Sequence, residues 1–356
     1  MGNPEFAQRL VDWQARAGRH HLPWQGNRDP YRVWLSEIML QQTQVTTVLG
    51  YFDRFLLRFP DVRALAQAAE GDVLALWSGL GYYSRARNLH RCAQVVVQDH
   101  GGVFPPSALE LAKLPGIGPS TAAAIASFCF GQRVSIFDGN VKRVMARHLG
   151  FDQDLSNAAA DRALKALVDQ RVPAEGQSHL MPAYTQGLMD LGATVCTPRR
   201  PRCVDCPLTD DCQARQQGRV DALPVKTRKL VRRTRLWWWL VLLADDGRVW
   251  LTRRPSRGVW AALHTFPTFD AEDALVGAVP PRLHSTVSEE PALTHVLTHM
   301  DLVIHPRVLR LSAHEVGEAV SWFDASSGAW FSHPADTVEL GLPSPVSKCL
   351  AQWLGG

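Results

Sequence analysis

The sequence predicts a multidomain protein in which an all-α domain with a cysteine-rich loop precedes an α+β domain. From Val33 to Gly192 the apolar residues recur mostly every three or four positions, which is the spacing of helices packed around a common core. Four cysteines then fall between Cys196 and Cys212. From Leu236 onward, short apolar runs such as LWWWLVLLA and RVWLTRR alternate with turn residues, which is typical of strands. A chain of 356 residues is also too long for one ordinary core.

We therefore expect three segments. Residues 1–212 should form the helical domain, residues 213–235 a basic linker with little periodicity, and residues 236–356 the second domain. Within the first domain, Asp29 and Pro30 mark the start of a helix. Two further helices should flank the Gly79 to Tyr83 turn. We expect the last helix of the chain at residues 343–354.

The distribution of charge is more informative than its sum, because the formal net charge is only +4. Basic residues gather in two segments, where we expect contact with a polyanion. One segment holds Lys226, Arg228, Lys229, Arg232, Arg233 and Arg235, and the other holds Arg199, Arg200 and Arg202. The start of the chain lacks the apolar core of a signal peptide, and no run is long enough to span a bilayer. These features predict a soluble, cytoplasmic protein without a membrane partner.

The stretch LPGIGPSTAAAI, residues 114–125, predicts a hairpin between two helices. Gly116 and Gly118 permit a tight turn whose backbone N–H groups point outward, and such a cluster of donors can hold a phosphate. A hairpin of this kind would grip the backbone of a nucleic acid. An ordinary connection between helices is the alternative.

The stretch FDGNVKRV follows a short strand-like run, Val134 to Phe137, and Asp138 opens a new helix there. Asp138 can be a simple N-cap, or a carboxylate that faces a sugar whose phosphate the hairpin holds. The two roles are compatible. A carboxylate that accepts hydrogen bonds from a helix N-terminus stays ionised, as it must to stabilise positive charge on a sugar.

The four clustered cysteines have the spacing of metal ligands. Six, two and five residues separate Cys196, Cys203, Cys206 and Cys212. Zinc also accepts four thiolates, but usually from two paired CxxC units. The less regular spacing here favours one [4Fe–4S] cluster. The other cysteines, Cys92, Cys129 and Cys349, are expected to be packed or partly buried thiols.

Taken together, the motifs resemble those of MutY-type adenine DNA glycosylases, endonuclease III-like members of the helix-hairpin-helix superfamily. The resemblance covers nearly the whole chain and rests on motifs in the family order: LPWQ, WLSEIMLQQTQV, GLGYYSRARNLH, LPGIGPSTA, DGNVKRV and the cysteine set. It implies a base excision repair enzyme that acts on double-stranded DNA with adenine mispaired with 8-oxoguanine or guanine. It also implies one [4Fe–4S] cluster that shapes the arginine-rich loop.

The resemblance assigns the chemistry to two carboxylates. Glu37 corresponds to the family's general acid, and partial burial would raise its pKa so that it holds a proton for adenine N7. A lone glutamate in such a helix is otherwise usually a surface residue. Asp138 would stabilise the sugar cation, with Asn140 fixing the local geometry. Ser120 stands where strand-cutting relatives carry a lysine, and serine cannot form an imine, so we expect monofunctional hydrolysis. Lys142 is the candidate for any adventitious lyase activity.

Other residues resemble those that hold the extruded base or probe the duplex. Trp24 offers stacking surface and Gln186 offers a donor and an acceptor, although a core tryptophan and a surface glutamine are the plain alternatives. Tyr82, after a Gly-Leu-Gly turn, is a candidate wedge or a core aromatic. The full set comprises Leu22, Trp24 and Gln186 for the base, and Gln41, Gln42, Thr43 and Tyr82 for the duplex.

The second domain resembles the MutT-like, or Nudix-like, C-terminal domain of the family, with GVWAALHTFP as its best local match. It lacks a Nudix-type acidic run, so we expect recognition of 8-oxoguanine and no nucleotide hydrolysis. The family's Phe-Ser-His loop corresponds here to Leu297, Thr298 and His299, and the leucine puts a stacking role at that position in doubt.

Two other functions stay open at this point: an endonuclease III-like lyase acting on oxidised pyrimidines, and a noncatalytic DNA-damage sensor. Ser120 argues against the first, and the intact pair of Glu37 and Asp138 argues against the second. We expect a monomer in a bacterial cytoplasm, associated with the nucleoid through DNA. Replication or repair proteins are possible partners that the sequence does not identify.

Overall fold

The computed structural model describes residues 4–227, 231–322 and 328–354. The chain divides into two compact units: Met1–Gln67 with Arg91–Lys229, and Ala68–His90 with Leu230–Gly356. Arg228 and Lys229 of the predicted basic segment lie outside the described residues. In the described part of the chain, no helix is both long and apolar enough to cross a membrane. The domain boundaries expected at residues 212 and 235 stay a prediction.

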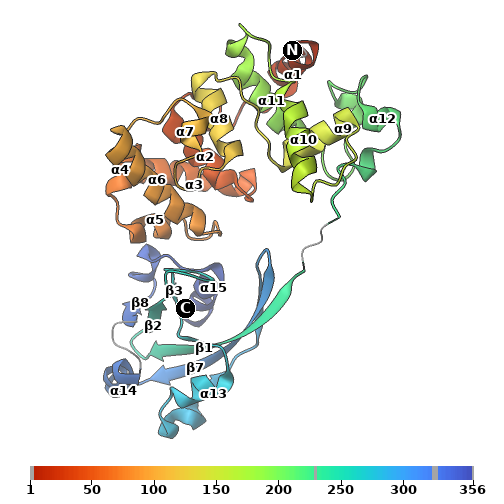
Figure 1. Cartoon of the computed structure of the whole chain (residues 1–356). Coiled ribbons are helices and arrows are strands. Elements are labelled where there is room, and N and C mark those ends of the chain that lie inside the picture. The colour runs from red at the N-terminus through yellow and green to blue at the C-terminus, as the bar shows by residue number, and fades with distance from the viewer. Residues whose placement is uncertain (1–3, 228–230, 323–327, 355–356) are drawn as a thin grey trace. The chain divides into compact units, whose positions relative to one another are not determined.

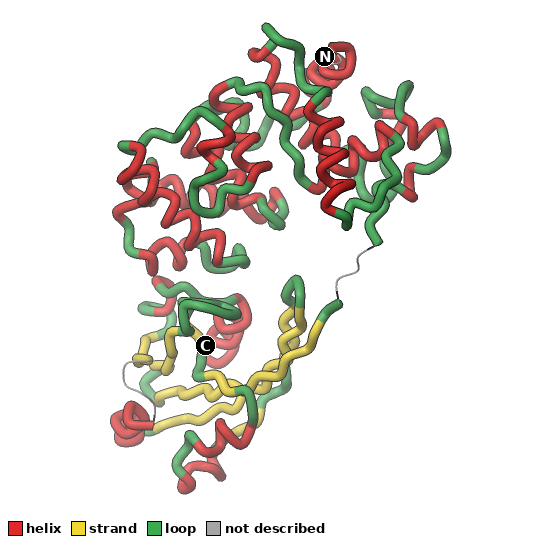
Figure 2. Tube along the Cα trace, viewed as in Figure 1, coloured by secondary structure: helices red, strands yellow, loops and turns green. Residues whose placement is uncertain are grey.

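The first unit is helical (Figures 1 and 2). Its helices begin where polar caps occur: Asp29 accepts a hydrogen bond from the Tyr31 N–H, and Asp138 accepts one from the Val141 N–H. Their bounds are α1 Pro4–Ala17, α2 Pro30–Leu40, α3 Val45–Arg58, α4 Val62–Gln67, α7 Ala108–Leu111, α8 Pro119–Phe130, α9 Gly139–Leu149, α10 Ala158–Asp169, α11 Met181–Thr194 and α12 Gln213–Gln216, with 3₁₀ turns η1 Ser178–Leu180, η2 Cys203–Asp205 and η3 Val220–Ala222. Helix α6, Ser84–His100, runs from the second unit into the first.

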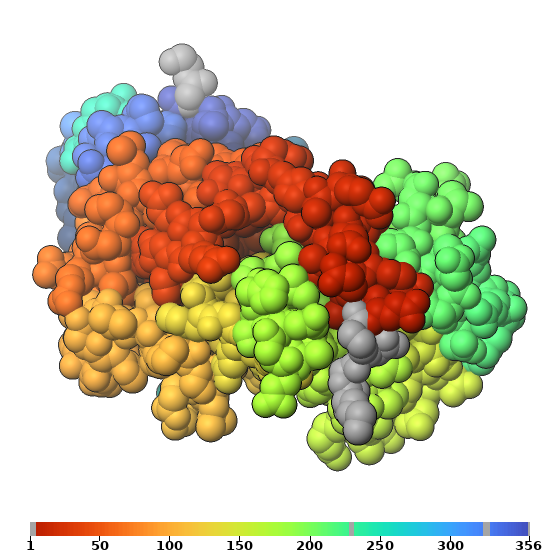
Figure 3. All heavy atoms as spheres, turned by 90° about the horizontal axis from the view of Figure 1, so that it is seen from above, coloured from red at the N-terminus to blue at the C-terminus, as the bar shows by residue number. Residues whose placement is uncertain are grey.

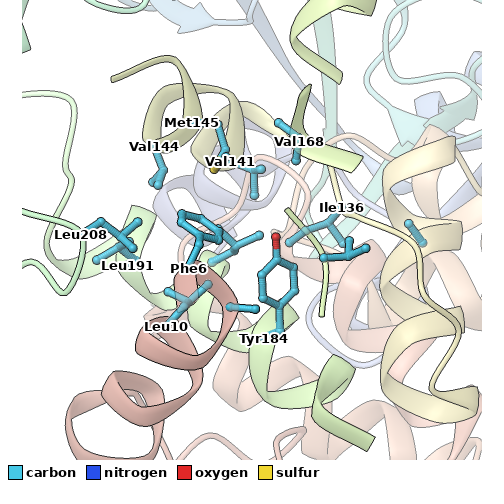
Figure 4. Close-up of a cluster of buried hydrophobic side chains, with 14 of the residues drawn as sticks. Phe6, Leu10, Ile136, Val141, Val144, Met145, Val168, Tyr184, Leu191 and Leu208 are labelled. Atoms are coloured by element: carbon cyan, nitrogen blue, oxygen red, sulfur yellow. The ribbon is translucent and has the colours of Figure 1, made fainter. Parts of the chain in front are cut away.

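A buried apolar cluster joins α1, α9, α10 and α11 (Figure 4). Phe6 and Tyr184 are fully buried in it. Helix α11 approaches its neighbours closely because it carries glycine at both contacts. A Cβ on Gly187 would lie 2.9 Å from Cγ of Leu10, and one on Gly192 would lie 2.7 Å from Cβ of Asn140. The cluster therefore fixes the start of α9, where Asp138 stands, against α11.

Two local expectations differ from the structure. The strand-like run Val134 to Phe137 is irregular backbone. Hydrogen bonds to side chains hold this segment in place. The Phe137 N–H donates to Ser120 Oγ, and the buried hydroxyl group of Ser135 donates to Asp169. The beginning of the expected linker, residues 213–222, contains α12 and η3, because Ala214 is buried against the first unit.

The second unit contains one mixed sheet with the strand order β3-β2-β1-β7-β5. Strands β1 and β7 are parallel over their full length, and every other pairing is antiparallel. The strands are β1 Arg233–Ala244, β2 Arg248–Arg253, β3 His264–Thr265, β4 Thr268–Phe269, β5 Ser288–Glu289, β6 Leu293–Val296, β7 Met300–Leu311 and β8 Gly328–Ser332. The helical elements are α5 Glu70–Leu76, α13 Glu272–Gly277, α14 Ala313–Ala319, α15 Ser344–Leu354, η4 Pro281–Thr286, η5 Val320–Trp322 and η6 Thr337–Glu339.

Alternation along β1 places apolar residues on both faces of this sheet. Leu240 and Leu242 pack with Leu275 of α13 and Val316 of α14. On the opposite face, the rings of Trp239 and Phe266 lie 5.2 Å apart, and Trp353 of α15 packs on Phe266 at 5.9 Å. Helix α15 confirms the helix expected at the end of the chain.

Residues 68–90 belong to this second unit through side-chain contacts. The Leu342 carbonyl accepts hydrogen bonds from Ser78 Oγ at 2.9 Å and from the Tyr83 hydroxyl at 2.7 Å. Arg87 donates to the Ala261 carbonyl at 2.7 Å. Helices α5 and α6 confirm the two helices expected around the Gly79 to Tyr83 turn.

Candidate active site

A cleft of about 1130 Å³ opens in the first unit among α2, α8, α9 and α11. It brings together most of the residues that the sequence singled out for catalysis and base binding. Those that line it are Leu22, Trp24, Glu37, Gln41, Gln42, Thr43, Ser120, Asp138, Asn140 and Gln186. The start of α9 and the middle of α2 thus place both carboxylates in one cleft.

Glu37 lies in the apolar helix α2 between the buried residues Ser36 and Ile38. Burial, and to a smaller degree the negative charge of Asp138, raises the pKa of Glu37 to about 8. The carboxyl group therefore holds a proton at neutral pH. This is the state in which it can act as a general acid.

Asp138 is half-buried and caps α9, with its Oδ1 accepting from the Val141 N–H at 2.8 Å. The residue before it, Phe137, donates its N–H to Ser120 Oγ at 3.1 Å. Ser120 is the second residue of α8, so the hydroxyl group ties the hairpin helix to the segment that presents Asp138. A lysine ammonium group has no acceptor, so it could not make this bond to the Phe137 N–H.

The hairpin between α7 and α8 is exposed at Gly116 and Gly118. Gly116 has φ +75° and Gly118 has φ −80°, so the backbone requires glycine only at the first position. Gly118 is the N-cap of α8 and leaves the first N–H groups of that helix to solvent.

Leu22 and Trp24 are buried residues that line the cleft. The ring of Trp24 packs edge-on against that of Phe52, with 5.4 Å between the ring centres. Gln186, which also lines the cleft, donates from Nε2 to Asp190 Oδ1 at 2.9 Å. Asp190 in turn accepts from Arg19 Nε at 2.7 Å. Arg19 and Asp190 were not predicted from the sequence, where the one available signal was the four-residue spacing of Gln186 and Asp190 on a helix.

Among the described residues, five non-glycine positions have left-handed backbone; two are Trp260 and Ala262, and the other three are predicted DNA contacts. Gln42 (φ +57°), Tyr82 (φ +49°) and Arg200 (φ +50°) all adopt it. Gln42 follows Gln41, which ends α2 and donates from Nε2 to Thr121 Oγ1 at 3.2 Å. Such strain persists where the surrounding structure enforces it and is common at functional sites.

The four clustered cysteines line one small cavity in the loop after α11. None forms a disulfide, and burial raises the pKa of the Cys206 thiol to about 12. Among the described residues, no three His, Cys, Asp or Glu side chains lie near enough to hold a single metal ion. The four thiols nevertheless face one shared cavity in this loop. Cys92 and Cys349 are buried and Cys129 is half-buried, as expected.

Two buried arginines of α9, also missed in the sequence, connect this loop to the cleft. Arg147 donates to Cys196 Sγ at 3.4 Å and to the Thr197 carbonyl at 2.8 Å. Arg143 donates from Nη2 to Asn140 Oδ1 at 2.9 Å and from Nε to the Cys196 carbonyl at 2.8 Å. Because positions 140, 143 and 147 share one face of α9, one helix presents both the catalytic candidate and the partners of the loop.

The loop surface is basic and joined to the N-terminal helix. Arg199, Arg200 and Arg202 are all exposed, as contact with a polyanion requires. In Figure 3 the red N-terminal segment borders the green segment that includes the loop. There Arg9 Nη2 and Asp211 Oδ2 form an ion pair at 2.6 Å.

In the second unit, Leu297, Thr298 and His299 form the turn between β6 and β7. The Leu297 N–H donates to the Met300 carbonyl at 2.9 Å, and Arg232 donates to the Leu297 carbonyl at 2.7 Å. Thr298 and His299 are exposed and Leu297 is half-buried. The Tyr82 side chain is 44 % exposed, and its hydroxyl group lies 2.6 Å from Thr298 Oγ1. Tyr82 is therefore not a core aromatic.

Three family models match the chain. They describe an HhH-GPD superfamily base excision DNA repair protein at residues 35–170, the iron-sulfur binding domain of endonuclease III at 196–212, and a NUDIX domain at 238–352. The adenine DNA glycosylase of Buchnera aphidicola (subspecies Acyrthosiphon pisum) is 34 % identical over 347 residues, covering 97 % of this chain and 96 % of the relative. The chain belongs to the adenine DNA glycosylase family.

The human member of this family and one solved structure are similar over part of the chain. The human adenine DNA glycosylase is 42 % identical over 222 residues, which cover 60 % of this chain and 40 % of the human protein. The structure of a thermostable thymine-DNA glycosylase aligns with a TM-score of 0.52 and 26 % identity, covering 60 % of this chain and 95 % of that one.

These matches confirm the predicted fold class: a helix-hairpin-helix glycosylase domain, an iron–sulfur loop and a Nudix-like domain. This adenine DNA glycosylase family member is an enzyme of base excision repair, binds DNA and carries an iron–sulfur cluster.

Proposed function

We propose that the enzyme hydrolyses the N-glycosidic bond of adenine mispaired with 8-oxoguanine or guanine in duplex DNA, without cutting the strand. One observation carries the proposal: the cleft holds a protonated Glu37, with a pKa of about 8, beside Asp138 at the start of a helix. Paired carboxylates in different environments divide acid and anion roles in sugar hydrolysis. The family membership supplies the base, because the relatives are named adenine DNA glycosylases.

The two carboxylates would act in sequence. Glu37 donates its proton to adenine N7, so the electron pair of the breaking C1′–N9 bond leaves with a neutral base. Asp138 stabilises the positive charge that develops on the sugar, and Asn140, held by Arg143, fixes the local geometry. Water then adds to C1′ and loses a proton, which leaves an abasic site.

The absence of strand cleavage follows from Ser120. Its hydroxyl group is engaged with the Phe137 N–H and cannot form an imine. Lys142, four residues after Asp138, is held by Asp161 at 2.6 Å, and its ammonium group lies 4.6 Å from the centre of the Phe137 ring. A monofunctional hydrolase is favoured over an endonuclease III-like lyase on these grounds.

The remaining cleft residues would hold the extruded base and the distorted duplex. Leu22 and Trp24 supply apolar walls and Gln186 supplies the amide that meets the base edge. The residues that would probe the duplex are Gln41, Gln42, Thr43 and Tyr82, of which Gln42 and Tyr82 have left-handed backbone. The exposed hairpin glycines and the arginines of the cysteine loop would bind phosphates: Gly116, Gly118, Arg199, Arg200 and Arg202.

Recognition of 8-oxoguanine is assigned to the β6–β7 turn of the second unit. Thr298 and His299 present a hydroxyl group and an imidazole to solvent. Both can bond to the edge of the damaged base. Leu297 is partly buried and held through its backbone, so we assign it a supporting role and no stacking role.

The iron–sulfur cluster is proposed to be of the [4Fe–4S] type, held by Cys196, Cys203, Cys206 and Cys212. The four cysteines line one cavity, and their spacing is less regular than the paired CxxC units that usually hold zinc. When bound, the cluster would hold the arginine-bearing loop in one conformation. Analysis of purified protein should find about four iron and four sulfide ions per chain. One zinc ion per chain would refute the assignment.

The experiment that tests the function is single-turnover cleavage of a duplex with adenine opposite 8-oxoguanine, quenched with and without hot alkali. Strand breaks that appear only after alkali are the expected result. Breaks without alkali would establish a lyase, and no breaks in either sample would favour a sensor or a different target base. A matching duplex with guanine opposite adenine measures the preference for 8-oxoguanine.

The cytoplasmic, nucleoid-associated location, the monomeric state and the absence of a membrane partner stay predictions. Partners among replication or repair proteins also stay unassigned. Light scattering of the protein on a single duplex would decide whether one copy or two bind.

A further inference from the structure

Asp190 is a buried carboxylate behind the wall of the cleft. It lies in α11, four residues after Gln186, and is fully buried. Its Oδ1 accepts from Arg19 Nε at 2.7 Å and from Gln186 Nε2 at 2.9 Å. Its Oδ2 accepts from the backbone N–H of Arg19 at 3.0 Å. An ion pair and a full set of hydrogen bonds thus hold this carboxylate in one position.

The bond to Asp190 decides how the Gln186 amide is turned. A carboxylate in an ion pair only accepts hydrogen bonds, so the amide must direct its Nε2 toward Asp190. Turning the amide over would bring Oε1 against Oδ1, two acceptors with no hydrogen between them. Oε1 is therefore the end of the amide that remains to accept a bond from a base in the cleft, which Gln186 lines.

We infer that Asp190 is a specificity-determining positioning residue, which fixes the Gln186 amide so that the cleft accepts a 6-amino purine and rejects a 6-oxo purine. The inference rests on the proposed function, since it concerns the base that this cleft receives. Adenine offers an amino donor at its 6-position, whereas hypoxanthine and guanine offer a carbonyl acceptor there. A 6-oxo base would set its oxygen against Oε1.

The size of the effect follows from the value of one well-placed base contact. Such contacts discriminate by about 1–3 kcal/mol, which corresponds to about 5- to 150-fold. Apolar walls such as Leu22 and Trp24 cannot supply this selection, because the two purines have nearly the same shape. Without a fixed amide, Gln186 could turn and donate to a 6-oxo group.

The test compares single-turnover excision of adenine and of hypoxanthine opposite 8-oxoguanine in otherwise identical duplexes. In Asp190→Asn the neutral amide can donate or accept, so Gln186 is free to turn. We expect the adenine-to-hypoxanthine rate ratio to fall by about tenfold or more. In Arg19→Lys, which keeps the carboxylate and a positive charge beside it, we expect the ratio to stay as in the wild type.

A second pair of variants separates orientation from structural damage. In a Gln186→Leu background, adding Asp190→Asn should leave the ratio unchanged, because no amide remains to be turned. If Asp190→Asn unfolds, the double variant Arg19→Leu/Asp190→Leu removes both charges together and tests the same loss of orientation. Thermal unfolding and iron content report whether each variant folds.

The outcomes distinguish this inference from the proposed function. A folded Asp190→Asn enzyme with the wild-type ratio would overturn the role of Asp190. A further change of the ratio in the Gln186→Leu background would also overturn it. A wild-type enzyme that releases no adenine would instead overturn the proposed function.

Discussion

The hydroxyl groups of Tyr82 and Thr298 lie 2.6 Å apart, although 216 positions separate the two residues in the chain. Tyr82 stands on strained backbone after the Gly79 to Leu80 turn, and Thr298 lies at the tip of the β6–β7 turn. Both belong to the second compact unit. The residue expected to wedge the duplex and the residue expected to read 8-oxoguanine are therefore coupled before DNA arrives.

This coupling predicts non-additive effects on damage recognition. Tyr82→Phe and Thr298→Val each remove one hydroxyl group, and each should weaken binding to a duplex with adenine opposite 8-oxoguanine by about 3- to 15-fold. The double variant should lose less than the sum, with a coupling energy of about 0.5–1.5 kcal/mol. Titration of the duplex with an uncleavable adenine analogue measures these affinities. Thr294→Val on exposed β6 is the control, and full additivity would contradict the coupling.

The raised pKa of Glu37 predicts how the rate of base release depends on pH. The acid role needs the protonated carboxyl group, whose pKa is about 8. Titration of Glu37 should leave the single-turnover rate unchanged below this pH and should lower it about tenfold per pH unit above it. Glu37→Gln should lower the rate by about 10²- to 10⁴-fold and abolish this alkaline limb. A rate that rises through pH 8 would exclude Glu37 as the acid.

The same carboxyl group should lower the stability of the fold at neutral pH. In the folded state it keeps its proton up to about pH 8, whereas in the unfolded chain it loses it near the ordinary value of 4.5. Unfolding therefore releases a proton between these values, and the free energy of unfolding falls as pH rises through that window. Glu37→Gln does not titrate and should be more stable than the wild type by about 1–3 kcal/mol at pH 7.

Chemical denaturation at several pH values measures this difference. The advantage of Glu37→Gln should shrink toward pH 4.5, where both side chains are neutral. Ser36→Ala, on the same buried stretch of α2, is the control, because its effect on stability should not change with pH. A stability difference that is equal at pH 4.5 and pH 7 would contradict the burial of an ionisable group at this position.

Local signals made much of this molecule predictable from sequence. The caps at Asp29 and Asp138 and the glycine-marked turn before Tyr82 each depend on neighbouring residues, so their helices were placed correctly. The β-branched and aromatic composition of the run Val134 to Phe137 predicts a strand, but the run is irregular backbone, since the described part of the first unit offers it no partner strand. The Phe137 N–H donates to Ser120 Oγ instead, and the Val134 N–H donates to the Gln132 carbonyl.

The unpredicted parts of the site depend on distant pairs. Arg19 and Asp190 are 171 positions apart, and nothing in the apolar sequence of α11 marks Asp190 as more than a helix-surface carboxylate. From sequence alone Arg147 would be a surface cation, but in the fold the cysteine loop covers it. Such contacts are set by tertiary packing, and a single sequence contains no local pattern that reveals them.

We expect Arg147 to help retain the iron–sulfur cluster, because it holds the loop that carries the cysteines. Arg147 is 3 % exposed, and its guanidinium group donates to Cys196 Sγ and to the carbonyl groups of Thr197 and Leu223. Arg147→Lys keeps the charge but cannot reach all three, so the purified protein should lose iron and melt at a lower temperature. Iron per chain is the measurement, and exposed Arg199→Lys on the same loop should retain its iron. Full iron content in Arg147→Lys would refute the role.

The contacts of Lys142 explain why this amine forms little imine with the abasic sugar. Its ammonium group is held by Asp161 at 2.6 Å and lies over the Phe137 ring, one helical turn from Asp138. A paired, protonated amine is a poor nucleophile toward the abasic sugar. Asp161→Asn removes the ion pair that restrains the amine and should raise the yield of borohydride-trapped enzyme–DNA adduct by about 3- to 10-fold.

The matched control is Asp161→Asn combined with Lys142→Arg, which retains a cation over the Phe137 ring but has no amine that forms an imine. This double variant should trap no more adduct than the wild type, while adenine release continues in both. If Asp161→Asn alone leaves the trapped yield unchanged, the ion pair does not restrain the lysine. Adduct that persists without Lys142 would place the reactive amine elsewhere in the chain, and Ser120 would then be an insufficient reason for monofunctional hydrolysis.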